Sequence, residues 1–135
     1  MKLLLIPVIT MLLIFPVFDV VAGSDNDRGT ELTAKPNEAV FEVHGVVCSF
    51  CAVGLQKKLS QLPFVDQSRY KKGVHVAIKD QRVTVAVRPN SEVDVQSAYS
   101  AIKSGGYEAN KAVAADATGA LTLYDKDGKI CTTCD

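Results

Sequence analysis

The sequence has no tryptophan, only two methionines and no excess of either charge. Without tryptophan, the Trp-Cys-x-x-Cys form of a redox-active cysteine pair cannot occur. A formal net charge of zero gives no indication of nucleic acid or of an anionic membrane surface as a partner. These absences direct attention to the cysteines and to the pattern of apolar residues.

The longest apolar run extends from Leu3 to Phe18, with Lys2 before it and small residues at Ala22 and Gly23 after it. This arrangement is typical of a secretory signal peptide. The run contains prolines and is shorter than the roughly 20 residues that cross a bilayer, which disfavours the alternative of an uncleaved anchor. We therefore expect residues 1–23 to be a signal peptide, cleaved at Ala22 or Gly23, and the mature protein to be periplasmic or secreted.

The rest of the chain alternates between strand and helix patterns. A polar linker at 24–38 is followed by one domain at 39–113. Within it, apolar alternation predicts strands at 39–46, 74–78, 83–87 and 108–113, and spacings of three and four residues predict helices at 50–62 and 91–104. The second helix is expected to begin with a capping box formed by Ser91 and Asp94. The order strand, helix, strand, strand, helix, strand predicts a ferredoxin-like α+β sandwich.

Residues 114–135 form a C-terminal extension. Apolar residues at 120–124 and 129–130 flank the polar sequence Asp125-Lys126-Asp127-Gly128, which predicts a hairpin. This sequence is similar to the start of a calcium-binding loop, but the twelfth position, which needs a glutamate, would fall beyond residue 135. We therefore interpret it as a turn.

The four cysteines form two Cys-x-x-Cys pairs, Cys48 with Cys51 and Cys131 with Cys134. Cys48 precedes the first predicted helix and Cys51 lies in its first turn. Free N–H groups and the positive end of the helix dipole favour thiolates there. Two soft sulfurs without a third ligand suit Cu(I) and other thiophilic cations. The first pair is therefore the candidate metal site.

The sequence Gly45-Val46-Val47-Cys48-Ser49-Phe50-Cys51, between the first strand and the first helix, resembles the metal-binding loop of heavy-metal-associated domains. This family includes copper chaperones, domains of metal-transporting ATPases and periplasmic mercury-binding proteins, and an exported single domain is most similar to the last. The resemblance implies Cys48 and Cys51 as ligands and Tyr107, after Gly106, as a packing neighbour. Val46-Val47 depart from the family's usual Met-Thr or Met-Asp, and the family's basic module lacks the tail pair.

Several alternatives remain open at this point. Cys48 and Cys51 could instead serve thiol–disulfide exchange or form an inert disulfide, as cysteines of exported proteins often do. Cys131 and Cys134 could form a second metal site, a disulfide or part of a four-sulfur site, although they lie much further along the chain than the ligands of a compact zinc ribbon. Single histidines such as His44 are more often surface residues than ligands.

We therefore expect an exported, non-enzymatic carrier, chaperone or scavenger of a soft metal ion. Cu(I) and Hg(II) are the favoured ions, with Zn(II) and Cd(II) as alternatives. The expected mechanism is thiolate ligand exchange with a metal-transporting membrane protein or another thiol metal carrier. We expect a monomer that binds no nucleic acid. Lys57 and Lys58 are interpreted as a solvated helix face, with partner docking as the alternative.

Overall fold

The computed structural model describes residues 31–132, so the predicted signal peptide and Cys134 lie outside the described residues. Strands and helices follow each other in the predicted order, and two further strands come from the C-terminal extension. The elements are β1 (Glu38–His44), α1 (Ser49–Leu59), β2 (Val74–Ala77), β3 (Arg82–Ala86), α2 (Val95–Ser104), β4 (Glu108–Ala115), β5 (Leu121–Tyr124) and β6 (Ile130–Cys131). No helix within the described range is long and apolar enough to cross a membrane.

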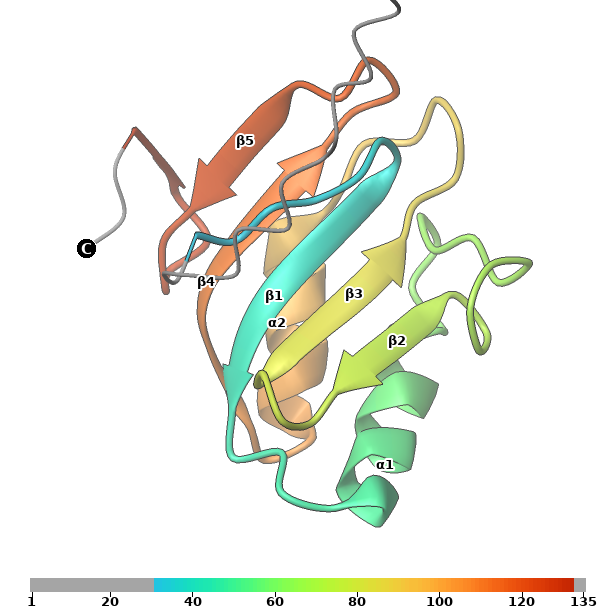
Figure 1. Ribbon diagram of the computed structural model, residues 1–135, viewed down its shortest axis with the longest axis vertical. Helices are drawn as coiled ribbons and strands as arrows, with labels where there is room; N and C mark the ends of the chain where they lie inside the picture. Colours follow the sequence, from blue (N-terminus) through green and yellow to red (C-terminus); the bar gives the residue numbers. More distant parts are fainter. Residues whose placement is uncertain (1–30, 133–135) are drawn as a thin grey trace, which may run out of the picture.

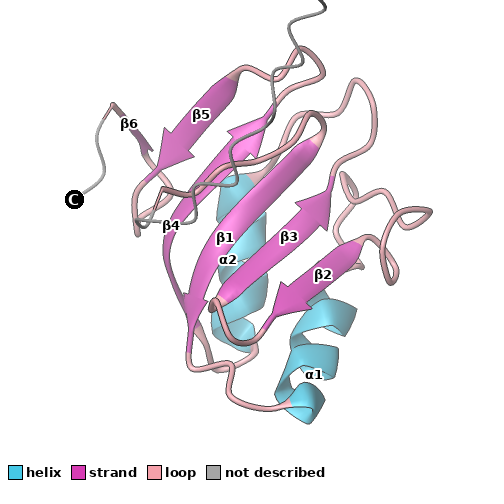
Figure 2. Ribbon diagram, viewed as in Figure 1, coloured by secondary structure: helices cyan, strands magenta, loops and turns pink. Residues whose placement is uncertain are grey.

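The strands form one sheet in the order β2-β3-β1-β4-β5-β6, and all neighbouring strands are antiparallel. The first four positions reproduce the ferredoxin-like arrangement, in which β1 and β3 lie in the centre. Both helices cover the same face of the sheet (Figures 1 and 2). The predicted α+β ferredoxin-like fold is thus confirmed.

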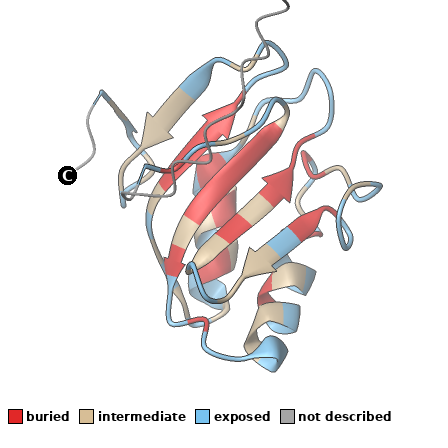
Figure 3. Cartoon of the chain, viewed as in Figure 1, coloured by how far each residue is buried: buried red, intermediate tan, exposed pale blue. Residues whose placement is uncertain are grey.

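The main core lies between this face of the sheet and the helices. In β1, Phe41 and Val43 alternate with outward-facing residues and are fully buried, as the two-residue period of a strand requires. Leu55 and Leu59 from α1 and Ile102 from α2 meet them. Burying side chains of this size contributes about 1.5–3 kcal/mol each relative to exposure, so this cluster is the main source of stability. Figure 3 shows how burial concentrates in the central strands.

The opposite face of the sheet carries a second, smaller apolar cluster. Leu32, from the segment predicted as a linker, packs with Val40 of β1 and Val113 of β4, and Leu123 of β5 adjoins them. Leu32 is buried, which a solvated linker residue would not be. The segment before β1 therefore contributes to packing from at least residue 32 onward.

The C-terminal extension forms the predicted hairpin, and this hairpin continues the main sheet. Strand β5 pairs with β4, and β6 pairs with β5. From α2, Gln96 donates hydrogen bonds to the carbonyls of Asp127 and Gly128, and the Tyr99 hydroxyl donates one to the carbonyl of Asp125 at 2.8 Å. The hairpin turn is thereby fixed to the helix layer.

Two predicted helix ends are wrong. The N-cap of α2 is Asp94, whose carboxylate accepts from the Ser97 amide at 3.0 Å, so no capping box starts at Ser91. Aspartate caps a helix as well as serine does, and starting here puts Val95 directly into the core. Helix α1 ends at Leu59 instead of residue 62, because the residue before Pro63 is disfavoured in helical conformation.

Candidate metal centre

The loop between β1 and α1 begins where β1 leaves the sheet. The register between β1 and β4 shifts between Glu42 and Val43, and such a bulge bends a strand and re-aims the residues that follow it. Gly45 then adopts a φ of +92°, which favours glycine over residues with a Cβ. Val46 next turns into the core with 1% of its surface exposed. These features direct the chain from the sheet to the start of α1.

Cys48 is the N-cap residue of α1. Its backbone is extended, and its sulfur accepts a hydrogen bond from the Cys51 amide at 3.3 Å. The side chains of Cys48 and Cys51 point toward the same place, with their sulfurs 2.7 Å apart. Both are free thiols. The structure therefore brings the two predicted ligands together at a helix N-terminus, where thiolates are favoured.

Neighbouring side chains act on the Cys51 thiol. The Cys48 side chain, and after it the Tyr107 hydroxyl, lower the pKa of Cys51 below its ordinary value. The contact with Cys51, and after it burial, raises the pKa of Tyr107. The structure thus places Tyr107 directly against one sulfur of the cysteine pair.

Gly105 makes room for the Tyr107 ring, because a Cβ added there would lie 3.1 Å from the ring. A Cβ added to Gly45 would lie 3.7 Å from the ring, which is an ordinary contact distance. Gly106, with a φ of +87°, turns the chain after α2 so that Tyr107 reaches the cysteines. The Gly106-Tyr107 sequence therefore has a clear role in the geometry of the site.

The surroundings of the cysteines are exposed and apolar. Val47 is 78% exposed and Phe50 is 87% exposed, although both are large hydrophobic residues. Figure 3 shows that the loop and the first turn of α1 lie open to solvent. Cys48 is exposed and Cys51 half-buried. Another protein can therefore approach both sulfurs directly.

Cys131 is not brought to this site. Cys131 lies on β6 at the far edge of the sheet and is disulfide-bonded, whereas Cys134 lies outside the described residues. Within residues 31–132, no three side chains of cysteine, histidine, aspartate or glutamate form a group that could hold a metal. The geometry of this region therefore provides a two-sulfur site at Cys48 and Cys51.

The other candidates lie on the surface. His44 is exposed and contacts the Glu42 carboxylate at 3.0 Å. Lys57 and Lys58 are exposed on α1. The Asp125 carboxylate accepts the amides of Asp127 and Lys129, as expected for a tight turn.

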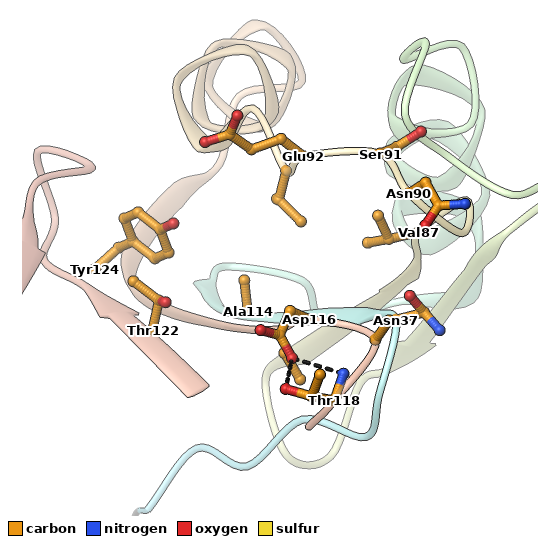
Figure 4. A pocket seen from close by; sticks show the side chains of 13 residues that line it. Asn37, Val87, Asn90, Ser91, Glu92, Ala114, Asp116, Thr118, Thr122 and Tyr124 are labelled. Carbon is orange, nitrogen blue, oxygen red and sulfur yellow. Dashed lines mark hydrogen bonds between the residues drawn. The ribbon is translucent and has the colours of Figure 1, made fainter. Parts of the chain in front are cut away.

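A cavity of about 340 Å³ lies away from the cysteines, near the start of β1 (Figure 4). Polar residues line much of it: Asn37, Asn90, Glu92, Asp116, Thr118 and Tyr124. The Asp116 carboxylate already accepts the hydroxyl and amide of Thr118 and the Ala120 amide. Because neither cysteine nor histidine is among the residues that line this cavity, it is a weaker candidate for a soft-metal site than the cysteine loop.

One residue at the site had no signal in the sequence. Gln81, in the turn between β2 and β3, has its side-chain amide bonded to Gly45 and Val46. The sequence Lys79-Asp80-Gln81-Arg82 reads only as a polar turn, because glutamine has no distinctive spacing there. Only the fold brings this turn beside the end of β1 (Figure 1).

Known proteins similar to this chain include a probable transporter and a metallochaperone. No family model matches the chain. The chain is 31% identical over 118 residues to a probable copper-transporting ATPase, HMA5, of Arabidopsis thaliana. That match covers 83% of this chain but 11% of the ATPase, so the chain spans about a tenth of its relative's length. Among solved structures, a CopZ metallochaperone is 22% identical with a TM-score of 0.46, covering 53% of this chain and 97% of that one.

The fold and the site define an α+β domain that presents two thiols at the start of its first helix. The strand order, the Cys48–Cys51 loop and the match of most of the chain to part of a copper-transporting ATPase support the heavy-metal-associated domain family, as the resemblance of the loop implied.

Proposed function

We propose that this protein is a carrier of a single thiophilic metal ion, with Cu(I) as the favoured cargo. The observation that carries the proposal is the convergence of two free thiols, Cys48 and Cys51, on one exposed point at the start of α1. Two soft sulfurs at a helix N-terminus suit Cu(I) far better than oxygen-seeking ions. The match to a probable copper-transporting ATPase supports copper over Hg(II) as the first ion to test.

The carrier would act by ligand exchange without a change of oxidation state. A thiolate of the partner adds to the bound ion and gives a three-coordinate intermediate. One bond from the ion to Cys48 or Cys51 then breaks, and the released thiolate can take up a proton. A second exchange completes the transfer, so no catalytic step is needed. The exposure of Cys48 lets a partner thiolate reach the ion.

The partner we propose is a metal-transporting membrane protein or another thiol carrier. Exposed apolar residues beside the cysteines, above all Phe50, would pack against it. A rim of such residues is typical of a protein interaction site. We further propose, from the signal-like sequence at 1–23, that the carrier is exported.

The transfer reaction tests the proposal. The reduced protein is loaded with Cu(I) and mixed with a second dithiol protein. The second protein carries a chromophore whose absorbance changes when it binds copper. We expect complete transfer within seconds to minutes and none from the Cys48→Ser variant, which should not load. Catalytic turnover of insulin disulfides without copper transfer would instead assign the pair to thiol–disulfide exchange.

The contribution of the apolar rim can be separated from metal binding. Phe50→Ser should slow transfer while leaving the affinity for Cu(I) unchanged. Ile130→Ser is the matched control, because Ile130 is also strongly exposed but lies on β6, at the far edge of the sheet. Equal slowing by both variants would count against docking through Phe50.

A further inference from the structure

We propose that Gln81 is a positioning residue for the metal-binding loop, acting across the molecule from the turn between β2 and β3. The inference builds on the proposed function, because it assigns a second residue to the same site. Gln81 does not touch either sulfur. It acts through the backbone of Gly45 and Val46, which lead into Cys48.

The side-chain amide of Gln81 contacts two consecutive residues of the loop. Its Oε1 atom accepts from the Gly45 N–H at 3.0 Å, and its Nε2 atom donates to the Val46 carbonyl at 2.6 Å. These residues lie just beyond His44, the last residue of β1 that pairs with β4. One amide group thus continues the hydrogen bonding of the sheet beyond the point where the strand ends.

The Gln81 amide is itself held firmly. The second hydrogen of Nε2 goes to the Ile78 carbonyl at 2.7 Å, so both donors and the acceptor are used. The backbone carbonyl of Gln81 accepts from the Val43 amide at 2.8 Å. Main chain and side chain of this one residue therefore bind the chain at three places: Val43 near the end of β1, and Gly45 and Val46 just after it.

The backbone of Gln81 is in an unusual conformation, with a φ of +52°. Residues with a Cβ rarely adopt this region, and those that do are mostly asparagine, aspartate and histidine. The contacts to β1 offset the cost of this conformation. A glutamine in this place is thus explained by its side-chain bonds to the loop rather than by the turn.

The position of Cys48 depends on the segment that Gln81 holds. Gly45 bends the chain at a φ of +92°, and the buried side chain of Val46 fixes the next residue. Val47 and Cys48 are exposed, and Cys48 is bonded to the start of α1 through its sulfur and its carbonyl. Gln81 holds the other side of the loop, which leads from the sheet. Without the Gln81 amide, the loop gains freedom that must be lost again when both sulfurs bind one ion, so the affinity falls.

Two variants isolate the amide from the backbone conformation. Gln81→Gly tolerates the positive φ but removes the side chain. Gln81→Asn also tolerates this φ and keeps the amide, but it is one methylene too short to reach the loop. Gln67→Asn is the matched control, since Gln67 Nε2 donates to the Ser60 carbonyl at 2.6 Å in a different loop. All three are made in the full chain.

The affinity for Cu(I) is measured by competition with a chromophoric chelator. We expect both Gln81 variants to bind about tenfold more weakly, at the low end of what loss of a supporting contact costs a metal site. The Gln67 variant should bind like the parent protein. Unfolding in urea shows whether each variant is folded at the temperature of the titration. If one of the two Gln81 variants is not folded, the other is enough for the test.

A second readout does not involve metal. Hydrogen exchange at the Gly45 amide should become faster in the metal-free Gln81 variants than in the parent, with the exchange of core amides unchanged. If the parent binds no Cu(I), the proposed function fails and this readout alone decides the role of Gln81. If the parent binds but both Gln81 variants match it in affinity, the positioning role is overturned and the carrier function stands.

Discussion

The hydroxyl group of Tyr107 lies against the sulfur of Cys51, and after the Cys48 side chain it is the next cause of the lowered pKa of the Cys51 thiol. The two residues are far apart in the chain. They meet because β1 and β4 are neighbours in the sheet, so the loop after β1 and the loop before β4 lie at the same end. The geometry around the two sulfurs therefore depends on the pairing of these strands as well as on the Cys-x-x-Cys sequence.

The Tyr107→Phe variant should have a Cys51 thiol that titrates at higher pH than in the parent. The phenylalanine keeps the ring between Gly45 and Gly105 but cannot donate to the sulfur. Alkylation of Cys51 in a Cys48→Ser background, followed between pH 5 and 10, reports the thiolate. If the parent and the Tyr107→Phe variant gave the same pH profile of alkylation, the contact between Tyr107 and Cys51 would be contradicted. The Tyr99→Phe variant, altered in α2 but not at the cysteines, is the control.

Lowering of the Cys51 pKa also makes stability depend on pH. Because the folded state holds the thiolate better than the unfolded state, the contribution is present above the ordinary pKa of 9.0 and is lost as the pH falls through the lower, folded value. The reduced, metal-free protein should therefore gain stability as the pH rises toward 9.0. Urea unfolding at several pH values should show a smaller rise in Cys51→Ser. An identical slope in both proteins would exclude this linkage.

A buried carboxylate on β1 should be sensitive to the loss of its partners. Glu38 is 3% exposed and accepts hydrogen bonds from the Arg69 guanidinium at 2.5 Å and from the Tyr70 hydroxyl. Arg69→Met leaves the carboxylate without its charged partner and should cost about 2–3 kcal/mol. Urea denaturation gives the difference. The double variant Arg69→Met with Glu38→Leu should recover part of the lost stability. Its affinity for Cu(I) should equal that of the parent. If the stability losses of the two single variants simply add, the pairing is disproved.

Two glycines should respond to alanine in opposite directions. A Cβ at Gly73 would lie 2.4 Å from Val65 Cγ1 and 2.7 Å from the Asp66 carbonyl, and its φ is +83°. Gly73→Ala should therefore destabilise the protein by about 2 kcal/mol or more. Gly54, inside α1, has open space around it, so Gly54→Ala should stabilise by about 0.5–1 kcal/mol. Thermal unfolding measures both, and a shift of the same sign in each would be inconsistent with this geometry.

Much of the fold could be predicted because its signals are local. The alternation of Phe41 and Val43, the spacing of Leu55 and Leu59 and the stop at Gly106 each depend on neighbouring residues. The order of the elements then restricts the topology to a few choices. The position of Cys48 before a helix likewise follows from a short stretch of sequence.

The parts that the sequence did not reveal depend on contacts between distant segments. Leu32 looks like a linker residue, but Val40 and Val113 bury it. The sequence also gave no reason to expect β5 to continue the main sheet, since a hairpin pattern says nothing about its neighbour. Gln81 shows the same limit beside the cysteine loop, because its side-chain amide bonds to Gly45 and Val46, which only the fold brings near it.

The central claim is that Cys48 and Cys51 together hold one thiophilic ion. Native mass spectrometry tests it most directly. The sample is the protein over residues 24–135 with Cys48 and Cys51 reduced and the Cys131 disulfide intact, and Cu(I) is then added. We expect one Cu(I) per chain in the parent, and none in Cys48→Ser or in Cys51→Ser at the same free copper concentration. One bound ion in both variants would contradict the account.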